Sequence, residues 1–470
     1  MFVERVSSGI VGLDKVLKGG FIKGSSCLIK GGPGTGKTLI GLHFLAEGIK
    51  RGERSVLITF DERVDEIKRQ AEDFGLPADK IEFIDMFSKF SVLSMDAIVW
   101  GDNVMSDVLD FLSMIESETG KADRIFIDGI GVISDCVKDR GLSRRIISSI
   151  IHRLSGEATL VVSSEAFEEL GRGLISYVVS AEIQLERVEK DGRVFRILNL
   201  LKFRGDANIG RHYFEVRKSG VEVYPVIKHE AEKIWDRELI STGNAELDMM
   251  FGGGIYRGSQ VLICGKAGVG KTNLGLQLLM ENDKRGEKGI IYAFDESKEY
   301  ILERFQKLFA YEPKNIVVVE REFSSVGEFY DAAIQDFERI KPSVVVIDPI
   351  NALERIAGSK AESVNILNLL QNYLKQSGAL AVFINETIDA LDVFQFSGYG
   401  ISQYADYLLL GRYVELEGEM LKAIAVMKNR FGDHERTFRI LDMKSGKGLV
   451  VGKQLKEYTG LMSGHFEKLS

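Results

Sequence analysis

Short, continuous apolar runs alternate along the chain with stretches whose apolar residues recur at helical spacing. The run 27–30 is short enough for a buried strand, and the stretch 39–45 that follows it has the period of a helix. Similar apolar runs predict further buried strands at 56–60, 124–127, 159–164, 261–264, 290–294, 344–347 and 380–385. This alternation is typical of an α/β fold, in which helices flank a mostly parallel, twisted sheet.

A different pattern follows the last apolar run of each half. Two extended stretches flank Lys190-Asp191-Gly192, a strong turn signal, and two more flank Glu417-Gly418-Glu419. Each half is therefore expected to end in an antiparallel hairpin, at 182–188 with 193–202 and at 407–414 with 420–428.

The two halves repeat one another in sequence. Lys37 and Lys271 lie 234 residues apart, which is almost half of the 470-residue chain. The Leu-Asp pairs at 13–14 and 247–248 have the same separation, so the repeat extends well beyond the two lysines. The charged segment 228–233 has the character of a linker. We predict two tandem domains, residues 1–229 and residues 230–470, the second with a short C-terminal tail.

Residues 31–38 and 265–272 both have the pattern G-x-x-x-x-G-K-T, the phosphate-binding P-loop. Each follows a predicted strand and precedes a predicted helix, so the glycine-rich backbone and the helix N-terminus can surround a phosphate. The lysine is expected to reach the outer phosphates of ATP, and the threonine hydroxyl to hold Mg²⁺. The predicted ATP-binding residues are Gly32, Gly34, Thr35, Gly36, Lys37, Thr38, Leu39, Gly265, Ala267, Gly268, Val269, Gly270, Lys271, Thr272 and Asn273.

An acidic pair follows the next strand of each half, Asp61-Glu62 in the first and Asp295-Glu296 in the second. Acidic residues are also favoured at helix starts, so capping is the simpler explanation. In a parallel sheet, however, ligands lie at the carboxyl ends of the strands. We therefore predict that these carboxylates face the γ-phosphate and orient an attacking water.

A third shared feature is an apolar strand that ends in a single aspartate, Asp128 in the first half and Asp348 in the second. These residues fit the Walker-B role, in which a strand-end carboxylate binds Mg²⁺ through water, although any strand can end in aspartate. Together with Thr38 and Thr272 they are the predicted metal ligands. The acid-to-acid spacing is longer in the first half by about 14 residues, which predicts a surface excursion near 87–101.

Composition narrows the class of protein. An apolar content of 45% is sufficient for two cores, and a net charge of −8 argues against nucleic acid as the main partner. The three cysteines are scattered, which suits a reducing compartment. The N-terminus carries charge where a signal peptide needs an apolar core, and no apolar run approaches the length of a membrane span. We expect a cytoplasmic protein without a membrane partner.

These features together resemble the KaiC family of RecA-like P-loop ATPases, which have two tandem domains. The likeness covers the S/T-G-x-x-x-L-D opening of each half, both P-loops, both acidic pairs, the K-x-R sequence at each hairpin end and Gly400-Ile401-Ser402. It implies a homohexameric double ring with ATP-Mg²⁺ at each subunit interface and a regulatory or signalling function with an unknown protein partner. It further implies that the K-x-R residues reach the neighbouring subunit's γ-phosphate: Lys202 and Arg204 in one ring, Lys428 and Arg430 in the other.

The resemblance also implies a phosphorylation site at Ser402, by autophosphorylation in the second domain. A loop serine is the simpler interpretation of the residue itself. The chain departs from the family pattern at two kinds of position. Gln403 stands where the family has a companion threonine, and Asp61 and Asp295 stand where it has glutamate, whose side chain is one methylene longer.

Two other functions share this fold. A RecA-type recombinase or ring helicase would act on single-stranded DNA, but the acidic net charge and the lack of a basic-aromatic stripe argue against it. A non-enzymatic scaffold would use ATP only to hold its subunits together, but complete catalytic sets in both halves argue for an ATPase.

Overall fold

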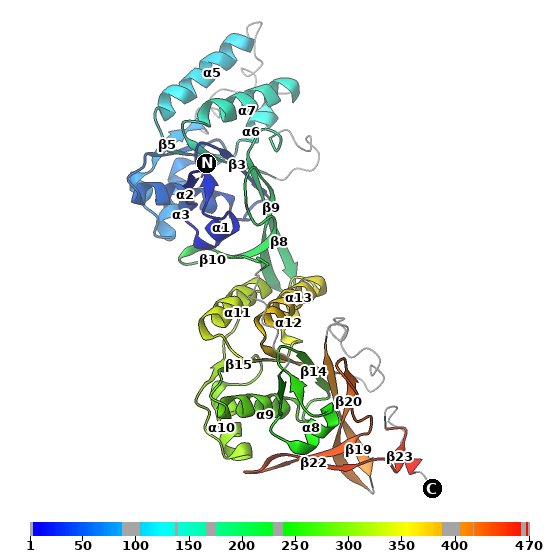
Figure 1. The fold of residues 1–470 in the computed structure, drawn as a ribbon. Helices are drawn as coiled ribbons and strands as arrows, with labels where there is room; N and C mark the ends of the chain where they lie inside the picture. The colour runs from blue at the N-terminus through cyan, green and yellow to red at the C-terminus, as the bar shows by residue number, and fades with distance from the viewer. Residues whose placement is uncertain are drawn as a thin grey trace. The chain divides into compact units, whose positions relative to one another are not determined.

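The computed structural model describes residues 3–86, 104–136, 140–165, 175–228, 238–387, 405–416, 418–461 and 467–468. The chain divides into two compact units, residues 1–227 and 228–470, whose folds are drawn in Figure 1. Each unit has its own nine-stranded sheet. The surface excursion predicted near 87–101 lies outside the described residues.

The sheet of the first unit has a parallel part and an antiparallel part. The parallel strands have the order β8-β3-β7-β6-β4-β5, so the P-loop strand β3 lies between β7 and β8. Their bounds are β3 (Ser26–Gly31), β4 (Ser55–Thr59), β5 (Glu82–Asp85), β6 (Arg124–Asp128), β7 (Thr159–Ser164) and β8 (Ala181–Lys190). The carboxyl ends of β3, β4 and β6 therefore meet at one edge of the sheet.

Alternate residues of these strands face two separate hydrophobic clusters, as the two-residue period of a strand requires. Cys27, Ile29 and Leu57 belong to one cluster, while Leu28, Val56 and Ile58 belong to the other. Helices cover both faces, and Figure 1 shows α5 and α7 side by side on one of them. The helices are α1 (Val11–Val16), α2 (Lys37–Lys50), α3 (Val64–Asp73), η1 (Ala78–Lys80), α5 (Val104–Thr119), α6 (Val132–Cys136) and α7 (Arg140–Leu154).

The second unit repeats this arrangement, with the sheet order β16-β15-β17-β18-β14-β19-β20-β21-β22. The P-loop strand β14 again lies in the middle, between β18 and β19. The parallel strands are β14 (Gln260–Gly265), β15 (Gly289–Ala293), β16 (Ile316–Val319), β17 (Val344–Asp348), β18 (Leu380–Glu386) and β19 (Tyr407–Leu416). The α/β fold class predicted from the sequence is confirmed.

Helices also flank the second sheet. Tyr292 of β15 packs edge-on against Phe329 and Phe337 of α11, with its hydroxyl donating to Asp336 at 3.1 Å, so this face is closed by aromatic contacts. The helices are α8 (Ala245–Phe251), α9 (Lys271–Lys284), α10 (Lys298–Phe309), α11 (Val326–Ile340), α12 (Ala352–Arg355) and α13 (Lys360–Ser377).

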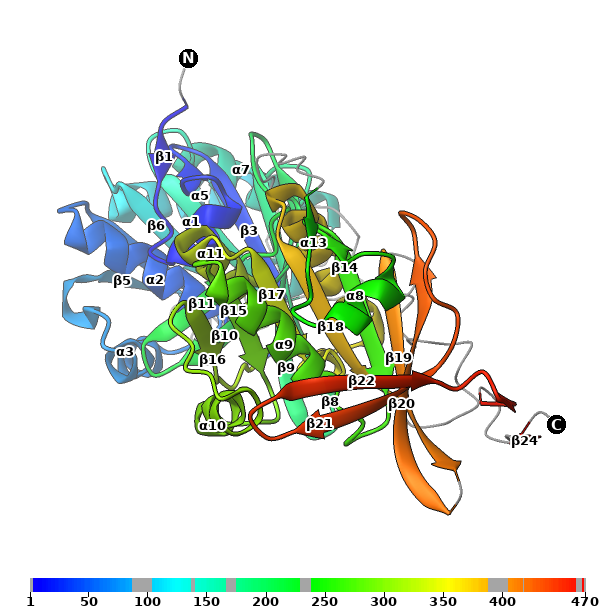
Figure 2. The same cartoon turned by 60° about the horizontal axis from the view of Figure 1, so that its bottom comes forward.

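The antiparallel part of each sheet is larger than the single hairpin predicted. The first hairpin pairs β8 with β9 (Arg193–Phe203), and two further strands extend it, β10 (Gly210–Arg217) and β11 (Gly220–Tyr224). In the second unit, β19 and β20 (Glu419–Asn429) are followed by β21 (Arg439–Lys444) and β22 (Gly448–Gln454), as Figure 2 shows. The added strands are short and carry charged residues, so they lack the continuous apolar runs of the parallel strands.

The Leu-Asp pair near the start of each repeat has a structural explanation. Asp14 accepts hydrogen bonds from the backbone N–H and the hydroxyl of Ser8, both at 2.7 Å, and Asp248 does the same for Thr242 at 2.7 and 2.6 Å. A carboxylate that accepts several such bonds fixes the chain before the first helix. The short strands near these motifs and at the C-terminus are β1 (Arg5–Val6), β2 (Phe21–Ile22), β12 (Leu239–Ile240), β13 (Ile255–Tyr256), β23 (Tyr458–Thr459) and β24 (Glu467–Lys468).

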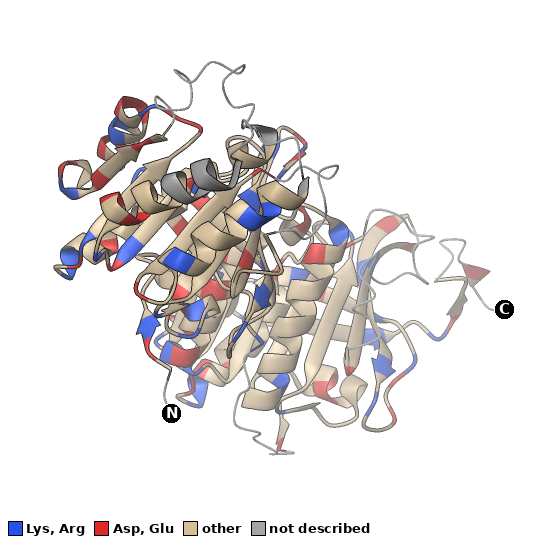
Figure 3. Cartoon of the chain, turned by 90° about the horizontal axis from the view of Figure 1, so that it is seen from above, with Lys and Arg blue, Asp and Glu red and all other residues tan. Residues whose placement is uncertain are grey.

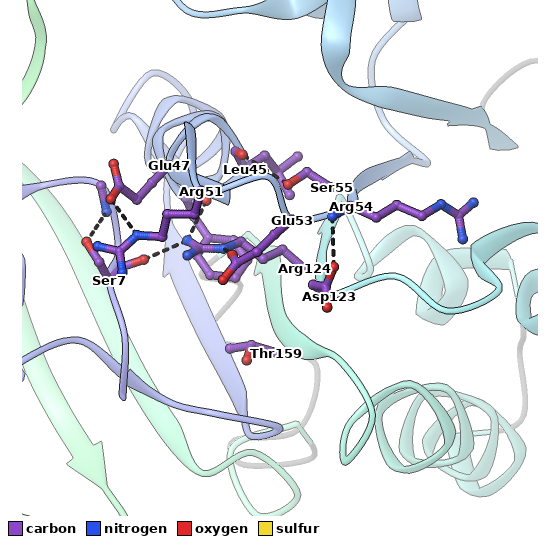
Figure 4. Close-up of polar contacts among 12 residues, drawn as sticks. Ser7, Leu45, Glu47, Arg51, Glu53, Arg54, Ser55, Asp123, Arg124 and Thr159 are labelled. Atoms are coloured by element: carbon purple, nitrogen blue, oxygen red, sulfur yellow. Dashed lines mark hydrogen bonds and ion pairs between the residues drawn. The ribbon is translucent and has the colours of Figure 1, made fainter. Parts of the chain in front are cut away.

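Arg124, the first residue of β6, joins several elements of the first unit (Figure 4). Its side chain is 1% exposed and forms an ion pair with Glu53. It also donates to the backbone carbonyls of Ser7 and Phe44, at 2.7 and 2.8 Å. Because a buried cation is costly without partners, this set of acceptors fixes the N-terminal segment and α2 against the sheet.

Candidate functional site

Both P-loops connect a central strand to a helix in the described structure. Gly34 and Gly36 have φ angles of 68° and 98°, and Gly268 and Gly270 have 76° and 111°, values that favour glycine. The helices α2 and α9 begin at Lys37 and Lys271. Their N-terminal N–H groups therefore face the space that the loop surrounds.

The P-loop lysines fold back onto their own loops. Lys37 Nζ donates to the carbonyls of Gly31 and Gly32, at 2.9 and 3.1 Å, and Lys271 Nζ donates to that of Lys266 at 2.8 Å. Burial lowers the pKa of Lys271. Phosphate oxygens are better acceptors for these ammonium groups than carbonyls, so a bound nucleotide would take over the contacts.

Two of the predicted phosphate-binding residues have side chains that cannot contact a phosphate in this arrangement. Leu39 is buried in the hydrophobic cluster beneath α2. Asn273 directs its amide nitrogen to the sulfur of Met443, at 2.8 Å. Both residues lie in the first turn of their helices, so the backbone N–H is the group each can offer to the anion.

The hydroxyl and carboxylate predicted to hold Mg²⁺ meet in both units. Thr38 Oγ1 lies 2.9 Å from Asp128 Oδ2, and Thr272 Oγ1 lies 2.6 Å from Asp348 Oδ2. Oxygen donors of this kind suit Mg²⁺, which keeps several waters and takes the rest of its ligands from phosphate. Among the described residues no group of three or more His, Cys, Asp and Glu forms a separate metal site.

The two strand-end aspartates differ in their hydrogen bonds. Asp128 accepts from Thr38 and also from Ser163, a residue of the neighbouring strand β7. By strand register the counterpart of Ser163 is the buried, apolar Ile384. Burial raises the pKa of both aspartates, and that of Asp348 rises to about 6 even though Thr272 donates to it.

Replacing Asp348 with asparagine is expected to stabilise the protein in the absence of nucleotide. A carboxyl whose folded pKa is raised opposes folding once it is charged, so this cost is present above about pH 6 and vanishes below the ordinary pKa near 4. At pH 7.5 the free energy of unfolding of the variant should therefore be higher by roughly 1–3 kcal/mol, and its melting temperature should rise. The gain in stability should shrink as the pH falls. Thermal denaturation at several pH values measures this. The exposed Asp442→Asn is the control, and equal melting temperatures for Asp348→Asn and wild type at pH 7.5 would contradict the expectation.

The acidic pairs lie next to these aspartates. Thr59 pairs with Asp128 across β4 and β6, and Phe60 N–H donates to the Asp128 carbonyl at 2.9 Å, so Glu62 lies just beyond the shared strand end. Gly129 makes this approach possible, because a Cβ there would lie 2.5 Å from Asp61 Cβ. The same backbone bond joins the strand ends of the second unit, where Phe294 N–H donates to the Asp348 carbonyl at 2.9 Å. Neither pair begins a helix, since α3 starts at Val64 and α10 at Lys298.

The two acidic pairs have different surroundings. Partial burial and the nearby Asp128 and Asp61 raise the pKa of Glu62. In the second unit, Glu296 Oε1 accepts from Arg304 at 2.6 Å, and Asp295 forms an ion pair with Arg355. Sequence reasoning missed both arginines. The only signal for Arg304 is its position eight residues after Glu296, on the helix that follows the acidic pair.

The K-x-R residues lie at the opposite edge of each sheet from the P-loop of the same unit. Lys202 pairs with Glu182, which pairs with Leu28, whereas the P-loop begins at Gly31, at the carboxyl end of β3. Lys202 Nζ donates to the carbonyls of Ser176 and Val179, at 2.6 and 2.8 Å, and burial lowers its pKa. In the second unit, burial lowers the pKa of Lys428, and Arg430 lies 3.8 Å from Asp406.

Several predictions fall outside these sites. Ser402 lies outside the described residues, so its phosphorylation stays a prediction from the sequence. Figure 3 shows that basic and acidic segments are interspersed along the ribbon. In the parts of the chain that the structure covers, every helix is too short or too polar to cross a membrane.

Fold and site together define a protein with two tandem P-loop nucleotide-binding domains. The family model described as "ATPase: KaiC" matches the chain twice, over residues 6–228 and 240–456. The chain belongs to the KaiC ATPase family.

Curated relatives match over nearly the full length. The circadian clock protein KaiC3 of Synechocystis sp. is 29% identical, with 98% of this chain and 94% of the relative covered. The circadian clock oscillator proteins KaiC of Picosynechococcus sp. and Synechococcus elongatus are each 27% identical, with 98% and 92% covered. The resemblance predicted from the motifs is confirmed.

Proposed function

We propose that the protein is an ATP-hydrolysing, ring-forming regulator whose sites are completed by a second copy of the chain. Each P-loop binds ATP with Mg²⁺ held by Thr38 and Asp128 or by Thr272 and Asp348. Glu62 and Glu296, each next to an aspartate, orient the attacking water. Bound Mg²⁺ would neutralise charge on the phosphates, and the chain's own residues position the nucleotide and the water.

The observation that carries this proposal is the position of the K-x-R residues. Lys202 is level with Leu28 on β3, so roughly 10 Å of strand separates its register position from the start of its own P-loop. Lys428 is likewise level with Leu262, through Leu408. Cations at this edge can serve a phosphate only on another copy, where they would stabilise transition-state charge as a trans arginine does. Such a contact joins two different surfaces of identical chains, the cation edge of one copy and the P-loop edge of the next. A closed ring makes this contact at every subunit, and we propose a homohexamer.

Mixing two inactive variants tests the trans arrangement. One carries Lys37→Ala and Lys271→Ala and keeps the K-x-R residues. The other carries Lys202→Ala, Arg204→Ala, Lys428→Ala and Arg430→Ala and keeps its P-loops. Each alone should hydrolyse ATP slowly. Their mixture should exceed the sum of the two by at least about tenfold, because a trans cation contributes a factor of about 10³ or more.

The control mixes the K-x-R variant with a chain that carries all six substitutions, and this mixture should gain nothing. If the first mixture also shows no more than the sum of its parts, the K-x-R residues do not act between chains. Normal hydrolysis by the K-x-R variant alone would also contradict the proposal.

The near full-length matches to clock KaiC proteins favour a regulatory function over a recombinase or ring helicase acting on single-stranded DNA. We propose a signalling or timing role with a protein partner, in the cytoplasm. Autophosphorylation at Ser402 is part of this proposal, because Ile401-Ser402 and Asp406 keep the family pattern. Intact-mass analysis after incubation with ATP-Mg²⁺ would contradict it if no phosphate is added or if Ser402→Ala retains it.

A further inference from the structure

The second unit contains an ion pair at its candidate catalytic carboxylate. Arg304, on α10, donates from its guanidinium to Glu296 Oε1 at 2.6 Å. The other oxygen, Oε2, is buried and has no hydrogen-bond partner among the described residues. The side chains of Glu296 and Arg304 are 31% and 38% exposed, so the pair lies at the surface of the site. One carboxylate oxygen is thus held by the helix, and the other is left without a donor.

The first unit lacks this cation at the equivalent position. Arg304 follows Glu296 by eight residues, and eight residues after Glu62 stands Gln70. The helices start in the same place, since α3 and α10 each begin two residues after the glutamate. The side-chain oxygen of Gln70, Oε1, is buried without a hydrogen-bond partner among the described residues. Within the same residues Glu62 forms no ion pair, and the charge of Lys37 acts on it from the P-loop. The two sites therefore differ at the candidate base itself, because only Glu296 has a guanidinium on the following helix as its hydrogen-bond donor.

This difference has a chemical consequence. A carboxylate oxygen that already accepts from a guanidinium is less available to accept a hydrogen bond from an attacking water. Its side chain is also held toward α10 and has to give up a charge-assisted hydrogen bond before it can turn to the nucleotide. The other charges near Glu296 leave this argument unchanged: Asp348 lies at the neighbouring strand end, and Asp295 is paired with Arg355.

We propose that Arg304 is a positioning residue that restrains Glu296 and keeps the second site slower than its P-loop and Mg²⁺ ligands would permit. This rests on the proposed function, in which Glu296 orients the attacking water. Hydrolysis at the second site then requires Arg304 to leave Oε1, whereas Glu62 of the first site has no such restraint.

The test exchanges the two residues, each in a chain whose other site is silenced. In a Glu62→Gln chain, Arg304→Gln should raise kcat for ATP roughly two- to fivefold, the range expected for loss of a partly exposed ion pair, with KM unchanged. Arg304→Lys keeps the positive charge and should stay near the parent rate. In a Glu296→Gln chain, Gln70→Arg should lower kcat by a similar factor.

Lys307→Gln is the matched control, because it removes a cation from the same helix that pairs with Glu303 and not with Glu296. It should leave kcat unchanged. A merely structural role for Arg304 predicts a loss of rate with Arg304→Gln, and Gln70→Arg supplies an independent answer if that variant folds poorly.

The outcomes separate the two levels of the proposal. The ATP hydrolysis that remains in the Glu62→Gln chain should be lost when Glu296→Gln is added. If it is not lost, or if none remains, the proposed function fails at the second site. If hydrolysis there depends on Glu296 but Arg304→Gln leaves kcat equal or lower, only the restraint by Arg304 is wrong. An unchanged rate with Gln70→Arg would likewise contradict the restraint.

Discussion

Replacing Glu62 and Glu296 together with glutamine is expected to reduce ATP hydrolysis at least about tenfold while ATP still binds. Glutamine keeps the shape of the side chain but cannot accept the proton of the attacking water. Its amide also leaves the Thr38–Asp128 and Thr272–Asp348 pairs unchanged, since neither glutamate contacts them by a hydrogen bond in the structure. Phosphate release under steady-state conditions measures hydrolysis, and a fluorescent ATP analogue measures binding.

The control for this variant is a second charge-neutralising pair on the helices that follow the two glutamates, Glu72→Gln on α3 and Glu303→Gln on α10. It removes the same net charge away from the nucleotide edge and should hydrolyse ATP at the wild-type rate. Undiminished turnover in the Glu62→Gln, Glu296→Gln protein would show that other residues orient the water.

Lys37→Ala combined with Lys271→Ala is expected to abolish ATP-dependent assembly. Each lysine lies at the first position of its P-loop helix, and its ammonium group donates to a backbone carbonyl of the loop. Removing it takes away the charge that holds the outer phosphates. Without bound nucleotide, the trans cations have no anion to contact, so monomers or small oligomers should remain. Mass photometry in ATP-Mg²⁺ buffer measures the distribution of species.

Lys50→Ala with Lys284→Ala serves as the control for the lysine variant. These residues end the same helices α2 and α9, so the helical composition and net charge change equally. The control should assemble as the wild type does. A full ring formed by the Lys37→Ala, Lys271→Ala protein without nucleotide would break the proposed link between binding and assembly.

The parts of the site that the sequence predicted best are those fixed by local chemistry. Positive φ angles at Gly34, Gly36, Gly268 and Gly270 are what the spacing of the P-loop requires. Asp128 and Asp348 could be placed beside Thr38 and Thr272 because parallel strands bring their carboxyl ends to one edge of the sheet. In both cases motif and topology together determine the neighbours.

The parts that were missed depend on which residues face each other across elements. Arg304 reaches Glu296 only because α10 starts two residues after it and turns this position toward the carboxylate. The bond from Ser163 to Asp128 depends on the register of β7 against β6. The strands β10 and β11 are short, and charged residues interrupt their apolar positions, so their apolar content alone did not reveal them.

The measurement that tests the account most directly is the mass of the wild-type protein with and without ATP-Mg²⁺. We predict a species of six chains of 52.4 kDa, about 314 kDa, in the presence of ATP-Mg²⁺, and smaller species after the nucleotide is removed. A chain that remains a monomer while it hydrolyses ATP at full rate would contradict the claim that a second copy completes each site.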